Sequence, residues 1–178
     1  PDVSINNSYI QLAFTLGKQV ENEATIFFKN FKKPIIAITG TRGKTTTTNW
    51  TAHFLNARFK STFAGNSHDN PFLKILDKQK SFERVVAEVP SFALEFFNQS
   101  VPPPDVAVVT NIYQDHLNRH QNLENYARVK ANLFRYQNPN QNLILNFDNE
   151  WTKFFLEQKP KAQIWFFSSK TLPKKLNG

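Results

Sequence analysis

The chain has 178 residues, enough for one domain of ordinary size, and 40% of them are hydrophobic, including 18 Phe that can fill a core. It contains no Cys, which excludes disulfides and thiolate metal sites, and no apolar run near the roughly 18 residues that a membrane span needs. The net charge of +8 comes from scattered Lys and Arg, so neither nucleic acid nor a membrane is the expected partner. We therefore expect a cytoplasmic protein. Because there is no Met and position 1 is Pro, we also expect a piece of a longer chain.

The first 33 residues are expected to be the exit from an upstream N-terminal domain, or a linker. Tyr9, Leu12, Ala13 and Leu16 keep the spacing of one helix face until Gly17 interrupts the pattern. A second short helix is expected over residues 21–31. The remaining residues, 34–178, are expected to form a globular unit.

From residue 34 on, apolar runs typical of strands alternate with helical patterns. Strands are expected over residues 35–38, 61–64, 84–88, 105–111, 142–147 and 163–167. Helices are expected over residues 44–58, 72–76, 122–136 and 150–157, and the first of them has Trp50, Phe54 and Leu55 on its apolar side. This alternation predicts an α/β fold with a doubly wound, mostly parallel sheet and right-handed crossovers.

The first expected strand runs directly into a glycine-containing polar loop, Gly40-Thr41-Arg42-Gly43-Lys44-Thr45-Thr46. The two glycines allow backbone N–H groups to surround an anion, and the following helix adds the positive end of its dipole. The Lys44 ammonium can reach terminal phosphates, and the Thr45 hydroxyl can bind Mg2+. Because Ile38 replaces the first glycine of the generic pattern, this is a variant P-loop. The alternative is a simple turn with a surface lysine.

Polar side chains also follow two later strands. Glu88 ends the strand at 84–88, and Asp115-His116 comes shortly after the strand at 105–111. Ligands of such sheets bind outside the carboxyl ends of the strands. Together with Thr45, Glu88 and His116 therefore predict a Mg2+ site. Taken separately, Glu88 could be a surface carboxylate, Asp115-His116 could cap the next turn, and Asn66 could support a turn.

Lys130 occupies an unusual place in the helical pattern of residues 122–136. It falls on the same face as Leu123, Tyr126 and Phe134. Burying an ammonium group there is costly. Either the side chain extends to the surface, or its pKa is lowered and the neutral amine has a chemical use.

Several stretches of the chain, taken together and in order, resemble the ATP-binding central domain of the Mur ligases. These enzymes add amino acids to the UDP-linked peptidoglycan precursor. The stretches are 38–46, Gly65-Asn66, 88–95, 111–120 and 126–130. Within the family, residues 92–95 and 115–119 are most similar to the branch that adds D-glutamate.

This resemblance implies an ATP-dependent carboxylate–amine ligase. The loop would bind the ATP phosphates, and the residues matching Thr45, Glu88 and His116 would serve Mg2+ ions. The lysine matching Lys130 is carbamylated in most members and helps to hold the second ion. The substrates would be the UDP-sugar-peptide precursor and D-glutamate, with Asn66 and Ser91 as weaker candidates for contacting them. A substrate carboxylate would attack the ATP γ-phosphate, and the amine would then displace phosphate from the acyl phosphate.

The chain departs from the family pattern at a few positions. Arg42 replaces a usual Asn, and Pro90-Ser91-Phe92-Ala93 replaces Ser-Ser-Phe-Gln, which removes polar groups expected near the sugar-peptide substrate. Residues 34–178 would be a partial central domain, truncated on its C-terminal side. The N- and C-terminal domains of the same enzyme would be its partners, so the fragment alone is expected to be inactive.

Two other functions remain open from the sequence. One is another ligase of the superfamily, either folate polyglutamylating or amidating. The other is a noncatalytic module that binds nucleotides or anions.

Overall fold

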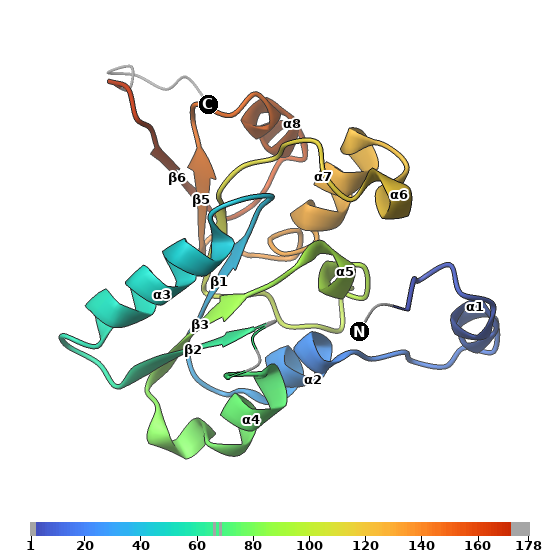
Figure 1. The fold of residues 1–178 in the computed structure, drawn as a ribbon, viewed down its shortest axis with the longest axis horizontal. Coiled ribbons are helices and arrows are strands. Elements are labelled where there is room, and N and C mark those ends of the chain that lie inside the picture. Colours follow the sequence, from blue (N-terminus) through green and yellow to red (C-terminus); the bar gives the residue numbers. More distant parts are fainter. Residues whose placement is uncertain (1–2, 66, 68, 172–178) are drawn as a thin grey trace.

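The computed structural model describes residues 3–65, 67 and 69–171. Its centre is a six-stranded sheet in the order β2-β3-β1-β4-β5-β6, and every pairing is parallel (Figure 1). The strands are β1 (Ile35–Thr39), β2 (Ser61–Gly65), β3 (Arg84–Glu88), β4 (Val106–Val109), β5 (Asn142–Asn146) and β6 (Gln163–Phe167). The predicted α/β fold is confirmed. Because β1 lies between β3 and β4, the loops that follow these three strands leave the same edge of the sheet side by side.

The helices lie between the strands in the predicted order, but the helix predicted to end at residue 136 ends at Ala131. They are α1 (Ser8–Thr15), α2 (Glu23–Asn30), α3 (Lys44–Leu55), α4 (Phe72–Asp77), α5 (Ser91–Leu94), α6 (Leu117–His120), α7 (Leu123–Ala131) and α8 (Trp151–Glu157), with a 3-10 turn η1 (Gln79–Ser81). The sequence did not predict α5, α6 or η1, since four residues or fewer are too short to show a helical period. None of the helices in the described ranges is long and apolar enough to cross a bilayer.

Each face of the sheet has its own apolar core. The larger core joins the sheet to α2, α4, α5, α7 and α8 and includes Phe27, Leu94, Phe134 and Phe155. The smaller core lies under α3 and consists of Ile38, Ala52, Val86 and Val108, with partly buried neighbours such as Leu55. The strands are therefore apolar on both sides, as expected for a parallel sheet covered by helices.

One prediction about α3 is wrong. Trp50 and Phe54, expected on its apolar side, are 65% and 68% exposed, and their rings contact each other edge to face on the surface. The buried residues of α3 are Thr48 and Ala52. Small side chains at this i, i+4 pair allow the helix to pack closely on the sheet, and the large aromatic residues then project beside the contact.

The N-terminal helix α1 stands apart from the sheet in Figure 1 and has no buried residue. By contrast, α2 belongs to the larger core. Its start is fixed by a reciprocal capping box between Asn22 and Thr25, and Phe27 and Phe28 anchor it.

Candidate functional site

The glycine-containing loop joins β1 to α3, and its two glycines adopt conformations that favour glycine. Gly40 has φ 143° and Gly43 has φ 80°. A Cβ atom on Gly40 would lie 1.9 Å from the Thr110 hydroxyl oxygen. Gly40 therefore permits the loop to pack directly against the end of β4.

The first turn of α3 offers free hydrogen-bond donors. Its N-cap residue is Gly43, and no side chain in the described ranges caps the helix. The Nζ atom of Lys44 donates to the carbonyl oxygen of Thr41 (3.0 Å), so the lysine lies over its own loop. Uncapped N–H groups, a helix dipole and a lysine together form an anion site.

The residues after β4 hold the loop, a role that the sequence motifs did not indicate. The N–H of Thr41 donates to the carbonyl of Asn111 (2.9 Å), and the Thr110 hydroxyl donates to the carbonyl of Arg42 (2.7 Å). The Asn111 side chain bonds both backbone groups of Arg42. Because the backbone of Arg42 is held in this way, the loop shape does not depend on its side chain. Arg can therefore stand where the family usually has Asn.

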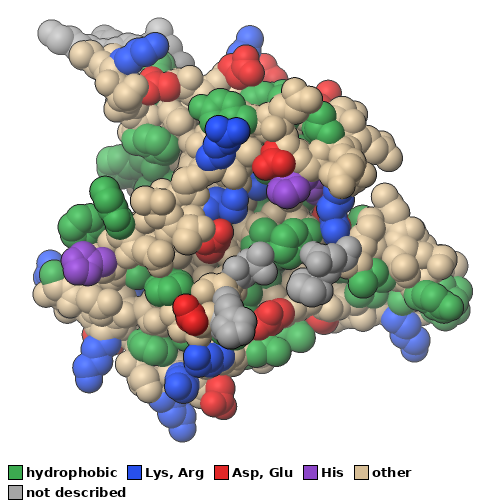
Figure 2. Space-filling model, in the orientation of Figure 1, with side chains coloured by type: hydrophobic (Ala, Val, Ile, Leu, Met, Phe, Trp, Pro, Cys, Tyr) green, Lys and Arg blue, Asp and Glu red, His purple; other side chains and the backbone are tan. Residues whose placement is uncertain are grey.

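Thr45 and Glu88, both predicted site residues, line one cleft of about 310 Å3. Asn49, Gly65, Ser67 and Asp69 also line it. Glu88 ends β3 between Ile38 of β1 and Gly65 of β2, and a Cβ atom on Gly65 would lie 2.7 Å from the Glu88 carbonyl oxygen. In Figure 2, side chains of both charges gather near the middle of the visible face. Asn66 lies outside the described residues.

Lys130 is buried, with 1% of its surface exposed, which excludes extension of its side chain to solvent. Its Nζ atom lies 3.3 Å from the Thr39 hydroxyl at the end of β1 and 4.6 Å from the centre of the Tyr126 ring. Burial lowers the pKa of Lys130 well below its ordinary value, and the charge of Lys44 lowers it further, whereas Asp115 opposes the shift. Burial thus favours the neutral amine, in line with the second interpretation of the sequence pattern.

Tyr126 connects Lys130 to other parts of the site. Its ring lies 6.2 Å from the ring of His116. Burial raises the pKa of Tyr126, so the phenol stays protonated. His116, the N-cap of α6, lies on the surface next to Asp115, with 3.7 Å between His116 Nε2 and Asp115 Oδ2.

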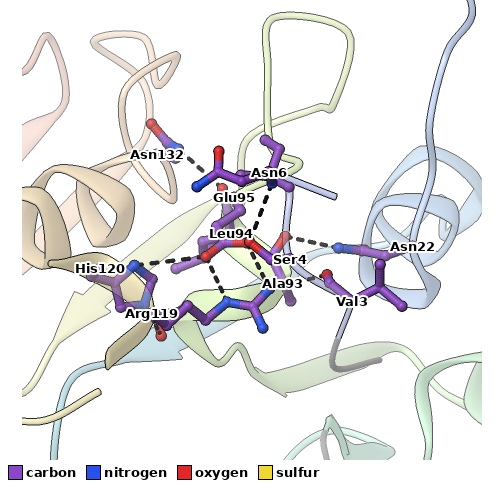
Figure 3. Close-up of polar contacts among 12 residues, drawn as sticks. Val3, Ser4, Asn6, Asn22, Ala93, Leu94, Glu95, Arg119, His120 and Asn132 are labelled. Carbon is purple, nitrogen blue, oxygen red and sulfur yellow. Dashed lines mark hydrogen bonds and ion pairs between the residues drawn. The ribbon is translucent and has the colours of Figure 1, made fainter. Parts of the chain in front are cut away.

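Ser91 is buried and does not line the cleft with Thr45 and Glu88. It belongs to a polar network between α5 and α6 whose residues Glu95, Arg119 and His120 are seen in Figure 3. Its hydroxyl oxygen lies 3.0 Å from His120 Nε2, and His120 Nδ1 lies 3.6 Å from Glu95 Oε1. Arg119 donates two hydrogen bonds of 2.7 Å to the Glu95 carboxylate and a third to the carbonyl of Val3. Burial lowers the pKa of His120 despite the nearby carboxylate.

The donors available for a metal ion are few. In the described ranges, no group of three or more His, Asp and Glu side chains lies close enough together to hold one. Thr45 and Glu88 together provide a hydroxyl and a carboxylate in one cleft. This set fits Mg2+, which commonly takes one or two protein oxygens and completes its shell with water and phosphate oxygens.

A parallel sheet whose central strand enters a glycine-lysine-threonine loop before a helix defines a P-loop α/β domain. More particularly, the chain belongs to the family described as the Mur ligase middle domain, which matches residues 38–177. The UDP-N-acetylmuramoylalanine–D-glutamate ligase of Acetivibrio thermocellus is 37% identical over 159 residues, which are 89% of this chain and 33% of that protein. The ligase of the same name from Clostridioides difficile is 34% identical over 179 residues, covering 100% of this chain and 38% of its own length.

Solved structures show the same fold at lower identity. The MurF ligase of Thermotoga maritima, in complex with ADP, is 24% identical with a TM-score of 0.66, covering 83% of this chain and 35% of that one. FolC of E. coli, also with ADP, is 17% identical with a TM-score of 0.57, covering 88% of this chain and 49% of that one. This chain thus spans about a third of the length of the curated relatives it matches.

Proposed function

We propose that this chain is the ATP-binding part of a ligase that joins D-glutamate to UDP-N-acetylmuramoyl-L-alanine in peptidoglycan precursor synthesis. The observation that carries the proposal is the uncapped start of α3, with Lys44 beside it, at the edge of the sheet where Glu88 ends β3. The names of relatives at 34–37% identity support the amino acid and the acceptor. Residues 1–33 would then enter from an upstream domain, and residues 34–178 would form part of the central domain.

The chemistry would proceed through an acyl phosphate. The substrate carboxylate attacks the γ-phosphorus of ATP and releases ADP, and the amine of D-glutamate then attacks the acyl carbon and releases inorganic phosphate. Gly40 to Thr46 would surround the phosphates with N–H groups, and Lys44 would neutralise charge on the transferred group. Protein catalysis would thus consist mostly of positioning and electrostatic stabilisation.

Mg2+ would be held by Thr45 and Glu88 in the cleft, with His116 as a further ligand and Lys130, when carbamylated, serving a second ion. The ions would neutralise phosphate charge. The carbamate forms when the neutral Lys130 amine attacks CO2 and loses a proton, and the buried position that lowers the pKa of Lys130 favours this neutral form. Asn66 and Ser91 stay candidates for contact with the acceptor, although the burial of Ser91 argues for a structural role.

The remaining parts of the ligase would bind the UDP-sugar-peptide and D-glutamate, because this chain spans only about a third of the length of its relatives. Such an enzyme would act in the cytoplasm, where ATP is available. The alternative of a folate polyglutamylating ligase has less support. FolC is only 17% identical to this chain, so the similarity supports the fold alone.

The test is calorimetric binding of Mg-ATP to this chain and to Lys44→Ala. We expect binding by the wild type and its loss in Lys44→Ala without a change in melting temperature, because this side chain reaches the loop rather than either core. Lys153→Ala, on the exposed side of α8, is the matched control and should bind normally. Wild-type affinity in Lys44→Ala would refute the phosphate-loop assignment. Salt-sensitive binding of nucleic acid instead would favour a basic anion-binding module.

A further inference from the structure

The connection between α6 and α7 is a strained turn. Gln121 has φ 68° and ψ −46°, and the N–H of Asn122 donates to the carbonyl of His120 (2.8 Å). A three-residue turn with these angles is the rare, strained form of the γ-turn. His116, at the other end of α6, also has a positive φ of 52°. Non-glycine residues rarely adopt such conformations, which persist only where surrounding contacts impose them.

The contacts that impose this turn come from α5. Arg119 and His120, the last two residues of α6, contact Glu95, the C-cap residue of α5 (Figure 3). His120 also contacts Ser91, the first residue of α5. The side chains of Glu95 and His120 are 5% and 3% exposed, so water does not weaken these contacts much. Beyond the turn, the Asn122 side chain caps α7 by accepting from the N–H of Asn125 (2.8 Å).

The two helices that the turn joins carry two of the proposed metal-site residues. His116 begins α6, and Lys130 lies in the last turn of α7. Tyr126 lies between them: its ring centre is 6.2 Å from that of His116, 5.1 Å from that of His120 and 4.6 Å from the Lys130 amine. A wider turn would move α6 away from this ring.

We infer that Gln121 is a positioning residue, and that its tight turn, which the contacts of α6 impose, fixes His116 and Lys130 relative to each other for Mg2+-dependent nucleotide binding. The inference rests on the proposed function, in which both residues serve the metal. Gln121 itself touches neither residue in any described contact, so it acts through the backbone of the turn.

The test compares two variants of Gln121. Glycine adopts positive φ without strain, so Gln121→Gly keeps the turn; its melting temperature should rise by about 2–4 °C, and the factor by which Mg2+ tightens ATP binding should stay at the wild-type value. A β-branched residue disfavours positive φ, so Gln121→Val opens the turn, and this factor should fall by about tenfold. ATP binding without Mg2+, which depends on the loop alone, should stay at the wild-type value.

Lys159→Val is the matched control. Lys159 has φ 51° and follows α8, whose return across the sheet places this end at the edge opposite the candidate site. This variant should lose stability and keep the full Mg2+ effect. Gln121→Val with an unchanged Mg2+ effect would overturn the inference alone, and so would an equal loss in Lys159→Val. A wild-type chain that binds no ATP would overturn the proposed function and this inference with it.

Discussion

The Asn111 side chain holds Arg42 by both backbone groups: Asn111 Oδ1 accepts from the Arg42 N–H at 2.9 Å, and Asn111 Nδ2 donates to the Arg42 carbonyl at 3.1 Å. The residue after β4 thereby sets the path of the loop after β1. Two strands that are neighbours in the sheet but far apart in sequence build one anion site. The site therefore also needs contacts within the protein that hold the loop in its shape.

We expect Asn111→Ala to weaken ATP binding by about tenfold, because it removes two hydrogen bonds worth roughly 0.5–1.5 kcal/mol each from the loop. The melting temperature should fall little, since Asn111 is only half-buried. Calorimetric titration with Mg-ATP and a thermal melt check both points. Asn138→Ala, which removes a side-chain bond in an exposed turn, serves as the control. Unchanged affinity in Asn111→Ala would show that the loop keeps its shape without this contact.

Lys130 should make stability depend on pH. Burial, and then the charge of Lys44, lower its pKa in the folded chain, so the unfolded chain binds this proton at pH values where the folded chain has released it. Folding stability therefore rises with pH between that lowered pKa and the ordinary value of about 10.4. In Lys130→Met this contribution is absent. The unfolding free energy of the wild type minus that of Lys130→Met should increase with pH by up to about 1.4 kcal/mol per unit, measured by urea denaturation. A constant difference from pH 7 to 10 would contradict the neutral amine.

In the proposed full-length ligase we expect Lys130→Arg to lose most activity, because guanidinium cannot form the carbamate and does not lose its charge. Lys130→Ala should also lose activity and recover part of it when a short carboxylate such as formate is added, since the anion can occupy the vacated space. Steady-state ADP release measures both effects, and Lys153→Arg is the control. Full activity in Lys130→Arg would remove Lys130 from the metal site.

The two Glu–Arg pairs on the helices should differ in strength. Glu95→Gln leaves Arg119 without its carboxylate in a buried setting and should cost about 2–3 kcal/mol of unfolding free energy. Glu124→Gln breaks the exposed pair with Arg128, four residues apart on α7, and should cost less than about 0.5 kcal/mol. Denaturant melts of both variants give the comparison. Equal costs would mean that the burial of Glu95 contributes nothing.

The sequence predicted the elements that carry a long apolar run or a long helical period. All six strands lie within a residue or two of their predicted bounds, because the strands of a parallel sheet are apolar on both faces. The periodicity alone could not predict which side of α3 packs on the sheet. Thr48 and Ala52 pack there because they are small, and a hydrophobicity pattern gives more weight to Trp50 and Phe54.

For the candidate site, the sequence identified residues whose chemistry is unusual for their place. Lys130 on an apolar helix face was such a residue, and its burial is confirmed. Asn111 and Gln121 could not be identified in the same way. Their roles depend on backbone atoms that they hold or on a turn angle, and an asparagine after a strand or a glutamine before a helix is common in any sequence.

The exposed aromatic residues of α3 also determine how unfolding can be observed. Trp50 and Trp165 are 65% and 57% exposed in the native state, and Trp151 is half-buried. Indole emission of the native chain should therefore already be close to that of indole in water. Denaturation will change it little, whereas far-ultraviolet circular dichroism will follow the loss of the helices. Acrylamide should readily quench the fluorescence of these exposed rings. A loss of that quenching would therefore show that another molecular surface covers them.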